Sequence, residues 1–547
     1  MADDFTRRAA RSFRARRMSA LERSAAGEAE RFGWPAGWLI AMDPPDAESY
    51  NRSGKKLWEA GEQEQAIALW REGLERHPDA VELLTSLAWG LGQRGKVAEG
   101  KGLAERAVAA RPEDPEPRHV LGVLLFLEGE YEAAVVHYQE AIEQNRGGPA
   151  ELTACLHRDL GDAYYTQGDF AQAARQYQTA LSSGGDKAYC HLWLGWSKHQ
   201  LGDLEGAAAD FAQAESLSPE WHEPLYAQGQ LCCAQGDYRR ARHLLERAIQ
   251  LCPGDDEEGQ AAAACELGNA LRGLGDLRSA MSRYQEALAL DPTHAVARFN
   301  LGLAYGELGD NEAALAAFDV AVQLDPDDPE IQVERGRARA ALGRHDDALE
   351  AYDAALDMEP DNAEAMSGMG LAYYSLGLYD AAADHYRSAA QRVPHDPWPR
   401  FNLALCLEGA GRHGEADQAM GEAWDLGQEN AALCLEIARA ITAHGRDPEA
   451  AAAAARRACA LDPESAEAHD ALATALYSAG DYEGALTAAR EAFRLLPEAA
   501  EYVYHLGLIH EARGDLLAAR ESFEHALALS PGFEEAEEAL RRLGDLH

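Results

Sequence analysis

The strongest constraint on this chain is a period of 34 residues. Gly302, Gly336 and Gly370 are spaced by 34, and a second glycine, an alanine, an aromatic residue and a proline follow each of them in the same order. We number the positions so that this first small residue is position eight, and it recurs fourteen times, from Gly54 to Gly507. A fixed period of this length is typical of stacked repeats, in which neighbouring repeats bury a shared core. The 547 residues therefore predict one repeat array rather than several unrelated domains.

Each repeat has the pattern of two helices joined by a tight turn. Apolar residues follow helical spacing, and a glycine at position fifteen is suited to the left-handed conformation that ends a helix. An aspartate often comes next, and aspartate is a favoured N-cap. Small residues at positions eight, twenty and twenty-seven allow close helix packing, while an aromatic residue at position twenty-four fills the remaining space. The pattern predicts an all-α fold of helix–turn–helix repeats.

Three repeats depart from the common length. The repeats at 115–153 and 222–260 have 39 residues, because they carry the additional segments PAELT and DEEGQ. One further step is 35 residues, and we place its extra residue in the second helix of repeat 12. The pattern leaves open whether the five-residue additions lengthen helices or form loops.

The consensus resembles the tetratricopeptide repeat family, as in ARFNLGLAYGELGDNEAALAAFDVAVQLDP from Ala297 to Pro326. The resemblance covers about residues 47–533. It implies a right-handed α-solenoid superhelix of about fourteen helix–turn–helix repeats, whose first helices line a concave groove for extended peptides or partner segments. Residues 534–547 form a polar segment that we expect to be a C-terminal capping helix.

The stretch from Gly90 to Lys96 has the GxxxxGK spacing of a phosphate-binding loop. The next residue is Val97 instead of the Ser or Thr that such a loop uses for Mg²⁺, and no strand pattern precedes the stretch. In the repeat register it is the end of one helix and the turn into the next. We therefore expect no nucleotide site here, but the additional glycines predict that repeat 2 is a weak point of the array.

The composition narrows the classes of function. With 93 acidic against 50 basic residues the formal net charge is -43, which argues against nucleic-acid binding and fits a basic partner, or no charged partner at all. The nine cysteines contain no CxxC and the histidines form no HExxH, so we expect no metal site, no cofactor and no catalytic residue. An odd set of cysteines, no apolar stretch of transmembrane length and no secretory signal favour a cytoplasmic protein.

The resemblance implies that positions two, five, six, nine, twelve and thirteen of each first helix face the groove. In the N-terminal half these positions are aromatic and are candidate anchors for a partner. The alternative is that they pack neighbouring helices. The candidates are Trp58, Trp89, Phe126, Tyr165, Trp193, Trp196 and Tyr226.

A second set of candidates is polar, and its members could grip the backbone of a bound peptide. They are Asn269, Arg272, Asn300, Arg337 and Asn402. The arrangement partly resembles the carboxylate clamp of some co-chaperones, but Cys265, Glu330 and Glu334 stand where that clamp has basic residues. We therefore do not expect a chaperone tail as the ligand. The alternative for the asparagines is that they belong to the plain family consensus.

Position two is glutamate in eight repeats. These side chains could line the groove and attract basic segments. Glutamate in the first turn of a helix also complements the helix dipole, and this is sufficient to explain most of them.

Residues 1–46 break the repeat and form an arginine-rich arm followed by the apolar segment FGWPAGWLI at 32–40. We expect the apolar segment to cover the first repeat. For the arm the alternatives are a solvated tail, docking into an acidic groove of the same or another chain with self-association, an organelle presequence, or a contact with an anionic membrane.

The sequence thus predicts a non-enzymatic scaffold or adaptor that binds an extended or helical segment of a partner protein. The alternatives are a recognition or regulatory subunit of a multi-protein enzyme or chaperone complex, and a self-assembling scaffold that uses its basic arm.

Overall fold

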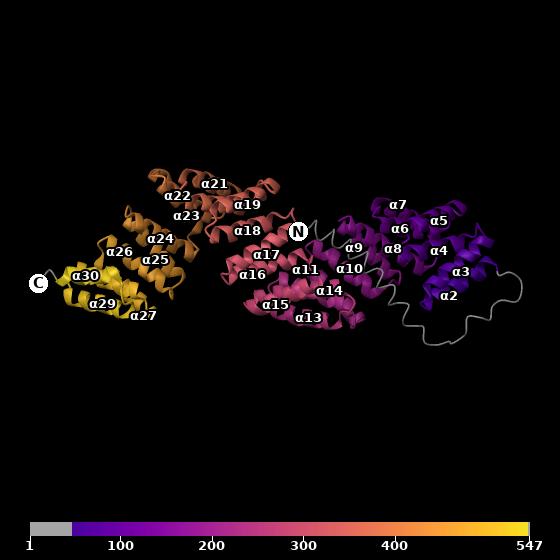
Figure 1. The fold of residues 1–547 in the computed structure, drawn as a ribbon, viewed down its shortest axis with the longest axis horizontal. Coiled ribbons are helices and arrows are strands. Elements are labelled where there is room, and N and C mark those ends of the chain that lie inside the picture. The colour runs from indigo at the N-terminus through magenta and orange to yellow at the C-terminus, as the bar shows by residue number, and fades with distance from the viewer. Residues whose placement is uncertain (1–45, 545–547) are drawn as a thin grey trace. The chain divides into compact units, whose positions relative to one another are not determined.

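The computed structural model describes residues 46–544, and the regular structure in this range consists of 29 α-helices with no strand (Figure 1). The described chain divides into two compact units, with the boundary between Pro292 and Thr293. The all-α prediction is therefore correct. We describe the two units separately.

The first unit contains seven helix pairs. They are α2 (Ala47–Glu59), α3 (Gln63–Arg76), α4 (Val81–Gln93), α5 (Val97–Ala110), α6 (Pro115–Glu128), α7 (Tyr131–Gln144), α8 (Ala150–Thr166), α9 (Phe170–Ser182), α10 (Lys187–Gln200), α11 (Leu204–Leu217), α12 (His222–Ala234), α13 (Tyr238–Leu251), α14 (Glu257–Gly273) and α15 (Leu277–Leu290).

The second unit contains seven further pairs and one terminal helix. They are α16 (Ala295–Glu307), α17 (Asn311–Leu324), α18 (Pro329–Ala341), α19 (His345–Met358), α20 (Ala363–Ser375), α21 (Tyr379–Arg392), α22 (Trp398–Gly409), α23 (His413–Gly427), α24 (Ala431–His444), α25 (Pro448–Leu461), α26 (Ala466–Ser478), α27 (Tyr482–Leu495), α28 (Ala500–Ala512), α29 (Leu516–Leu529) and α30 (Glu534–Gly544).

Within each unit the two helices of a repeat pack together, and most first helices also contact the first helix of the next repeat. Examples are α4 with α6 in the first unit and α24 with α26 in the second. Among the described residues, successive second helices do not approach each other as closely. The even-numbered helices therefore form a closely spaced surface in each unit, which we call the first-helix face.

The turns inside the repeats have the predicted chemistry. The glycine at position fifteen has a positive φ in every repeat, for example 79° at Gly309 and 90° at Gly129. A residue with a β-carbon is strained in this region of the backbone. Most of the aspartates that follow accept a hydrogen bond from the amide three residues later and cap the second helix; these are Asp169, Asp203, Asp237, Asp276, Asp310 and Asp481. Asp515 is at the same position without a side-chain cap bond.

The core of each repeat is the predicted contact between positions eight and twenty-four. A β-carbon on Gly302 would lie 2.5 Å from the ring of Phe318, and one on Gly161 would lie 2.8 Å from the ring of Tyr177. Both rings are almost completely buried. Only glycine lets the first helix come this close to the aromatic residue of the second, which confirms the packing prediction.

The five-residue additions lengthen helices. Both α8 and α14 have 17 residues, whereas α16 has 13, and the additional residues extend the N-terminal end of each helix. The placement of the single extra residue in the second helix of repeat 12 was wrong. This helix, α25, has the usual 14 residues, and the extra residue lies in the turn before it. Asp447 caps α25 and Pro448 occupies its first turn, so the helix begins one residue later after Gly445.

The glycine-rich stretch of repeat 2 is helix and turn, as expected. Its first four residues are the end of α4, and Gly95 makes the turn with φ 74°. The glycines inside the helices are sites of close packing, because β-carbons on Gly90 and Gly92 would lie 2.9 Å from Trp70 and 2.5 Å from Leu124. A β-carbon on Gly100 would lie 2.7 Å from a backbone oxygen of α4.

The predicted arm and apolar segment of residues 1–45 lie outside the described residues. Asp46 is the N-cap of α2 and accepts a hydrogen bond from the amide of Ser49 at 2.9 Å. At the other end, Ala539 and Leu543 of α30 pack against Phe523 of α29. None of the helices that the structure describes combines the length and the apolar character needed to cross a bilayer.

Candidate functional site

A buried polar network lies under the first-helix face of the first unit. It joins α6, α8 and α10 around two almost inaccessible carboxylates, Asp159 and Asp162. His119 Nε2 lies 2.7 Å from Asp159 Oδ2, and the hydroxyl groups of Tyr177 and Tyr189 donate to the two oxygens of Asp162 at 2.9 and 3.1 Å. Buried carboxylates are stable only when they are paired or hydrogen-bonded, and this network satisfies both.

Arg158 supplies the positive charge of this network. Its Nε and Nη2 atoms lie 3.0 and 2.9 Å from Asp159 Oδ1, and its guanidinium lies 5.8 Å from the centre of the Tyr189 ring. The adjacent Asp159 raises the pKa of Arg158 despite burial, and burial raises the pKa of Tyr177. These groups therefore keep their charge states near neutral pH, and the network acts as a fixed polar core of repeats 3 to 5.

Two of the aromatic candidates are half-buried at the start of the first-helix face. The rings of Trp58 on α2 and Trp89 on α4 lie 4.8 Å apart between centroids, and Trp58 also stacks on the buried Trp70 at 5.9 Å. Tyr226 on α12 is also half-buried and packs beside the core of repeats 4 to 6. These three rings retain exposed surface for a partner.

The other four aromatic candidates are buried. Phe126, Tyr165, Trp193 and Trp196 have relative exposures of 1%, 0%, 6% and 8%. The Tyr165 and Trp193 rings meet edge-on at 5.2 Å, and Trp196 meets Phe211 in the same way at 5.0 Å. These rings hold successive helices together, and we place no partner contact on them.

Asn269 and Arg272, both on α14, lie in the first unit. Asn269 is half-buried; its side-chain oxygen accepts a hydrogen bond from Tyr284 at 2.8 Å, and its amide nitrogen donates to Glu266 at 3.3 Å. Arg272 is half-buried at the end of the helix. The bonds of Asn269 repeat those of Asp162 to Tyr177, which shows a structural role for position nine.

Asn300, Arg337 and Asn402 lie in the second unit, on α16, α18 and α22. Asn300 is 7% exposed and Asn402 is half-buried. Arg337 is exposed, and its guanidinium binds Glu334 on its own helix and Glu364 on α20, the latter at 2.8 Å. The structure therefore assigns Arg337 to the accessible surface and Asn300 to the interior.

Acidic groups dominate the surroundings of Arg337. Burial raises the pKa of Glu330, and the charges of Asp328, Glu334 and Glu364 raise it further. Burial is the largest cause of this raised pKa, and the three neighbouring carboxylates add to it. Four carboxylates, those of Asp328, Glu330, Glu334 and Glu364, thus lie close together, and two of them bind the exposed guanidinium of Arg337.

The same type of ion pair recurs later in the second unit. Arg439 on α24 binds Glu436 at 3.1 Å and Glu467 on α26 at 2.9 Å. Arg337 and Arg439 both occupy position nine, and their partners on the next first helix are position-two glutamates. Position two therefore faces the previous repeat here, in addition to its place in the first turn of a helix.

A cavity of about 520 Å³ opens between α22–α23 and α24–α25 in the second unit. Leu405, Met420 and Trp424 form part of its apolar wall, and Glu408 and Arg446 form an ion pair at its polar part. Burial opposes ionisation of Glu408, but the hydrogen bond from His413 and the charge of Arg446 lower its pKa overall. The turn that carries the extra residue of repeat 12 runs from Gly445 to Asp447. Arg446 and Asp447 of this turn also line the cavity.

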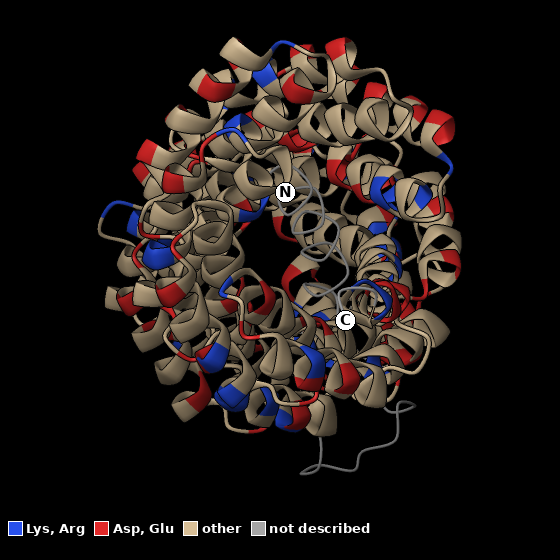
Figure 2. Cartoon of the chain, turned by 90° about the vertical axis from the view of Figure 1, so that its left-hand side faces the viewer, with Lys and Arg blue, Asp and Glu red and all other residues tan. Residues whose placement is uncertain are grey.

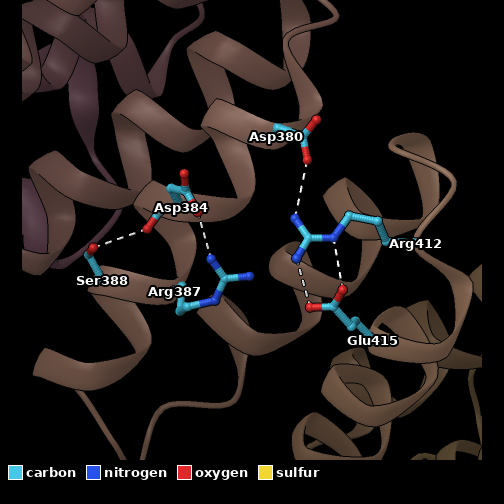
Figure 3. A network of polar contacts seen from close by, with 6 residues as sticks. All are labelled: Asp380, Asp384, Arg387, Ser388, Arg412 and Glu415. Atoms are coloured by element: carbon cyan, nitrogen blue, oxygen red, sulfur yellow. Dashed lines mark hydrogen bonds and ion pairs between the residues drawn. The ribbon is translucent and has the colours of Figure 1, made fainter.

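An ion-pair network also connects the second helices of two successive repeats. Arg412 binds Glu415 through two nitrogens, at 2.9 and 2.7 Å, and also reaches Asp380 of the preceding repeat at 3.2 Å, as Figure 3 shows. This arrangement ties α23 to α21. Figure 2 shows acidic residues spread widely over the helices, in agreement with the excess of 93 acidic over 50 basic residues.

Sequence reasoning identified the first-helix positions but missed the buried network and the cavity. Asp159 and Asp162 occupy positions six and nine, the same positions as Asn300 and Asn269, so a search for polar residues at these positions would have found them. The cavity has no comparable signal, because it depends on how four helices pack.

Two models of the tetratricopeptide repeat match the chain. One matches residues 158–220, 265–329, 333–397 and 471–532, and the other matches residues 117–183 and 223–293. Together these segments cover more than half of the chain.

Curated relatives match over shorter segments. A protein CTR9 homolog of Arabidopsis thaliana is 24% identical over 237 residues, which is 41% of this chain and 22% of the relative. The TPR repeat-containing protein YpiA of Bacillus subtilis is 24% identical over 255 residues, 46% of this chain and 58% of the relative. A probable biofilm formation methyltransferase, WspC, of Pseudomonas putida is 35% identical over 110 residues, 20% of this chain and 25% of the relative. The chain therefore spans less than two thirds of the length of each of them.

Solved structures with a similar fold include the Cut9–Hcn1 hetero-tetramer of the APC/C and the yeast Tom70. The TM-scores are 0.44 and 0.40, each at 17% identity; the matches cover 91% and 79% of this chain and 96% and 95% of the other chains. From the matches of the family models and the repeated helix pairs we conclude that this chain belongs to the tetratricopeptide repeat family.

Proposed function

We propose that this protein is a non-enzymatic scaffold that binds a basic, extended or helical segment of a partner protein on its first-helix face. The observation that carries this proposal is the acidic surface around Arg337. Its guanidinium is already bound by Glu334 and Glu364, and Glu330 beside them has a raised pKa. An incoming lysine or arginine would relieve this repulsion, whereas an acidic segment would increase it.

The packing of the helices supports the choice of surface. In each unit most even-numbered helices contact the next even-numbered helix, so side chains at equivalent positions form a row. A row of this kind offers a partner segment contacts at regular intervals. The half-buried Trp58, Trp89 and Tyr226 provide apolar contacts in the first unit, and Asn402 and the acids beside Arg337 provide polar contacts in the second.

The proposed compartment is the cytoplasm. All nine cysteines lie in the described part of the chain as free thiols, and six of them are buried. Burial raises the pKa of Cys190, Cys233 and Cys406 to about 12, which keeps these thiols protonated. Unreactive, buried thiols suit a reducing compartment.

The test compares labelled basic and acidic peptides, matched in length and apolar content, by fluorescence anisotropy with the full chain. We expect the basic peptides to bind, with an affinity that falls as salt is added. Replacing both Glu330 and Glu364 with glutamine should weaken this binding about tenfold, since each removed charge contributes roughly 0.5 to 1 kcal/mol at an exposed site.

The matched control replaces Glu350 with glutamine and Asp353 with asparagine, because both are exposed acids on the second helix α19. Like the test variant, it removes two negative charges. It changes the net charge without changing the first-helix face. Equal weakening by the control and by the Glu330/Glu364 variant would show that only the overall charge matters. Preferential binding of acidic peptides would contradict the proposal.

A further inference from the structure

Three side chains that bind metals in other proteins meet at one junction of the first unit. His222 is the first residue of α12, Cys252 follows the end of α13, and Asp256 precedes α14. One ligand atom from each of them lies within 4.8 Å of the other two. Cys252 and Asp256 are close in the sequence, whereas His222 is at the other end of the 39-residue repeat 222–260, which continues into α14 at this point.

Two of the three distances between these atoms match a tetrahedral zinc site. His222 Nε2 lies 3.5 Å from Asp256 Oδ2, and Cys252 Sγ lies 3.7 Å from the same oxygen. With zinc bonds of about 2.0–2.1 Å to nitrogen, about 2.3 Å to sulfur and about 2.0–2.2 Å to oxygen, a tetrahedron has N–O and S–O edges of about 3.4 and about 3.6 Å. The two measured distances agree with these edges, and the ligand atoms of His222 and Cys252 lie within 4.8 Å of each other.

Backbone hydrogen bonds hold the loop between α13 and α14 in this position. The amide of Cys252 donates to the carbonyl of Ala248 at 2.9 Å, and the amide of Asp256 donates to the carbonyl of Pro253 at 3.0 Å. The side chain of Gln260 donates to the same Pro253 carbonyl at 2.8 Å. The loop is thus ordered by contacts that do not involve the three candidate ligands' side chains.

The two carboxylate oxygens of Asp256 have different partners. Its Oδ1 accepts a hydrogen bond from the amide of Gly259 at 3.0 Å and caps α14, while its Oδ2 faces Cys252 and His222. The side chain of His222 is 5% exposed and that of Asp256 is 31% exposed, so the cluster is reached from solvent on the aspartate side. A buried imidazole and a buried sulfur beside a carboxylate match the ligand preferences of zinc better than those of calcium or magnesium, which take oxygen ligands.

We propose that His222, Cys252 and Asp256 bind one zinc ion, with a water molecule in the fourth position on the exposed side. On binding, the thiol of Cys252 loses its proton to solvent and the thiolate coordinates the ion, together with the neutral imidazole of His222 and the carboxylate of Asp256. The ion joins the ends of three helices, so it stabilises the junction between repeats 6 and 7. This proposal is independent of the partner surface proposed above.

The experiment titrates the full chain, reduced and freed of metal by a chelator, with zinc against a chromophoric competitor. A parallel titration with Co²⁺ reads the sulfur-to-cobalt charge-transfer absorption, which reports a thiolate ligand and is not produced by acidic surface residues. We expect one zinc per chain, a cobalt–thiolate band, and a higher midpoint of thermal unfolding with zinc.

The variants are Cys252→Ser, His222→Ala and Asp256→Asn. Asparagine is as good an N-cap as aspartate, so the last variant removes the charged ligand and keeps the cap of α14. Each should reduce zinc affinity at least about tenfold, comparable to the loss that even outer-shell changes cause. The cobalt band should disappear in Cys252→Ser, with unchanged helical circular dichroism in Asp256→Asn.

The control variants are Cys232→Ala and Asp237→Asn. Cys232 is a buried cysteine of α12, and Asp237 caps α13 as Asp256 caps α14. Both should bind zinc as the unchanged chain does. The proposal is wrong if the unchanged chain shows no cobalt–thiolate band, or if zinc binds equally well to the three ligand variants, because the ion would then be held by exposed acids elsewhere.

Discussion

Arg337 on α18 and Glu364 on α20 form an ion pair between successive first helices, with 2.8 Å between Nη2 and Oε2. Arg337 Nη1 binds Glu334 at the same time. This arginine is the positive charge inside the acidic surface that we propose as the partner site. Replacing Arg337 therefore tests two things separately: how its charge affects partner binding, and how its ion pairs affect stability.

Arg337→Ala should increase affinity for a basic peptide about threefold to fivefold, since it removes a repulsive charge from an exposed site. The free energy of unfolding should fall by no more than about 1 kcal/mol, because half-exposed ion pairs contribute little to stability. Peptide anisotropy and denaturant titration measure the two effects. The control is Arg387→Ala on the second helix α21, which also loses an ion pair, to Asp384. Lower affinity for the basic peptide in Arg337→Ala would argue that the arginine itself holds the partner.

Two glycines of α5 should respond oppositely to the same substitution. Gly102 is exposed in mid-helix with no atom near a β-carbon, so Gly102→Ala should stabilise the protein by about 0.5–1 kcal/mol. A β-carbon on Gly100 would lie 2.7 Å from the carbonyl oxygen of Ala88, so Gly100→Ala should destabilise it by about 1–3 kcal/mol. Hydrogen exchange in repeat 2 reads both changes locally. Equal effects of the two variants would mean that α5 does not pack against α4 as closely as described.

The buried network predicts a large cost for losing one carboxylate. Asp162→Ala leaves the hydroxyl groups of Tyr177 and Tyr189 without this acceptor and should lower the free energy of unfolding by about 2–5 kcal/mol. Tyr177→Phe added to Asp162→Ala should cost less than the sum of the two single changes, because the pair shares one bond. Denaturant titration of the four proteins gives the coupling. Strict additivity would show that the hydrogen bond contributes nothing to stability.

His505 makes the end of the second unit sensitive to pH. Its Nδ1 lies 2.8 Å from Asp470 Oδ1; burial opposes protonation, but the hydrogen bond and the charge of Asp470 outweigh it and raise the pKa of His505. A raised pKa in the folded state stabilises the protein fully below the ordinary histidine pKa of about 6.5. That contribution is lost as pH rises through the folded pKa, at no more than about 1.4 kcal/mol per pH unit.

The contribution of His505 to the free energy of unfolding should therefore fall as pH rises from about 6.5 through its raised folded pKa, and His505→Gln should remove this contribution. The control His395→Gln replaces an exposed histidine of the same unit and should leave the slope unchanged. Denaturant titrations across this range measure the slope. A steeper fall in His505→Gln than in the unchanged chain would contradict the assigned direction.

Much of the fold could be predicted because each repeat encodes its own turns and packing. Gly309 predicted a left-handed turn, and Gly302 predicted a close contact with Phe318, since glycine at these positions has a local physical reason. The extra residue before α25 was misplaced because an extra residue shifts the register equally whether it lies in a turn or in a helix. Only the cap at Asp447 and the proline after it decide between the two.

The candidate site was less predictable, because exposure depends on neighbouring repeats. Trp193 and Trp89 both occupy predicted groove positions of a first helix, but Trp193 is covered by Tyr165 and its neighbours, whereas Trp89 keeps exposed surface. The cluster of His222, Cys252 and Asp256 has no short motif, because its members are joined by the stacking of three helices. The spacing of these three residues in the sequence therefore does not predict the cluster.

The most direct test of the central claim is hydrogen–deuterium exchange of the full chain with and without a bound basic peptide. If the partner lies on the first-helix face, protection should increase in first helices, with α18 and α20 affected more than the second helices α19 and α21. Protection confined to the second helices, or spread equally over both, would contradict a first-helix binding surface.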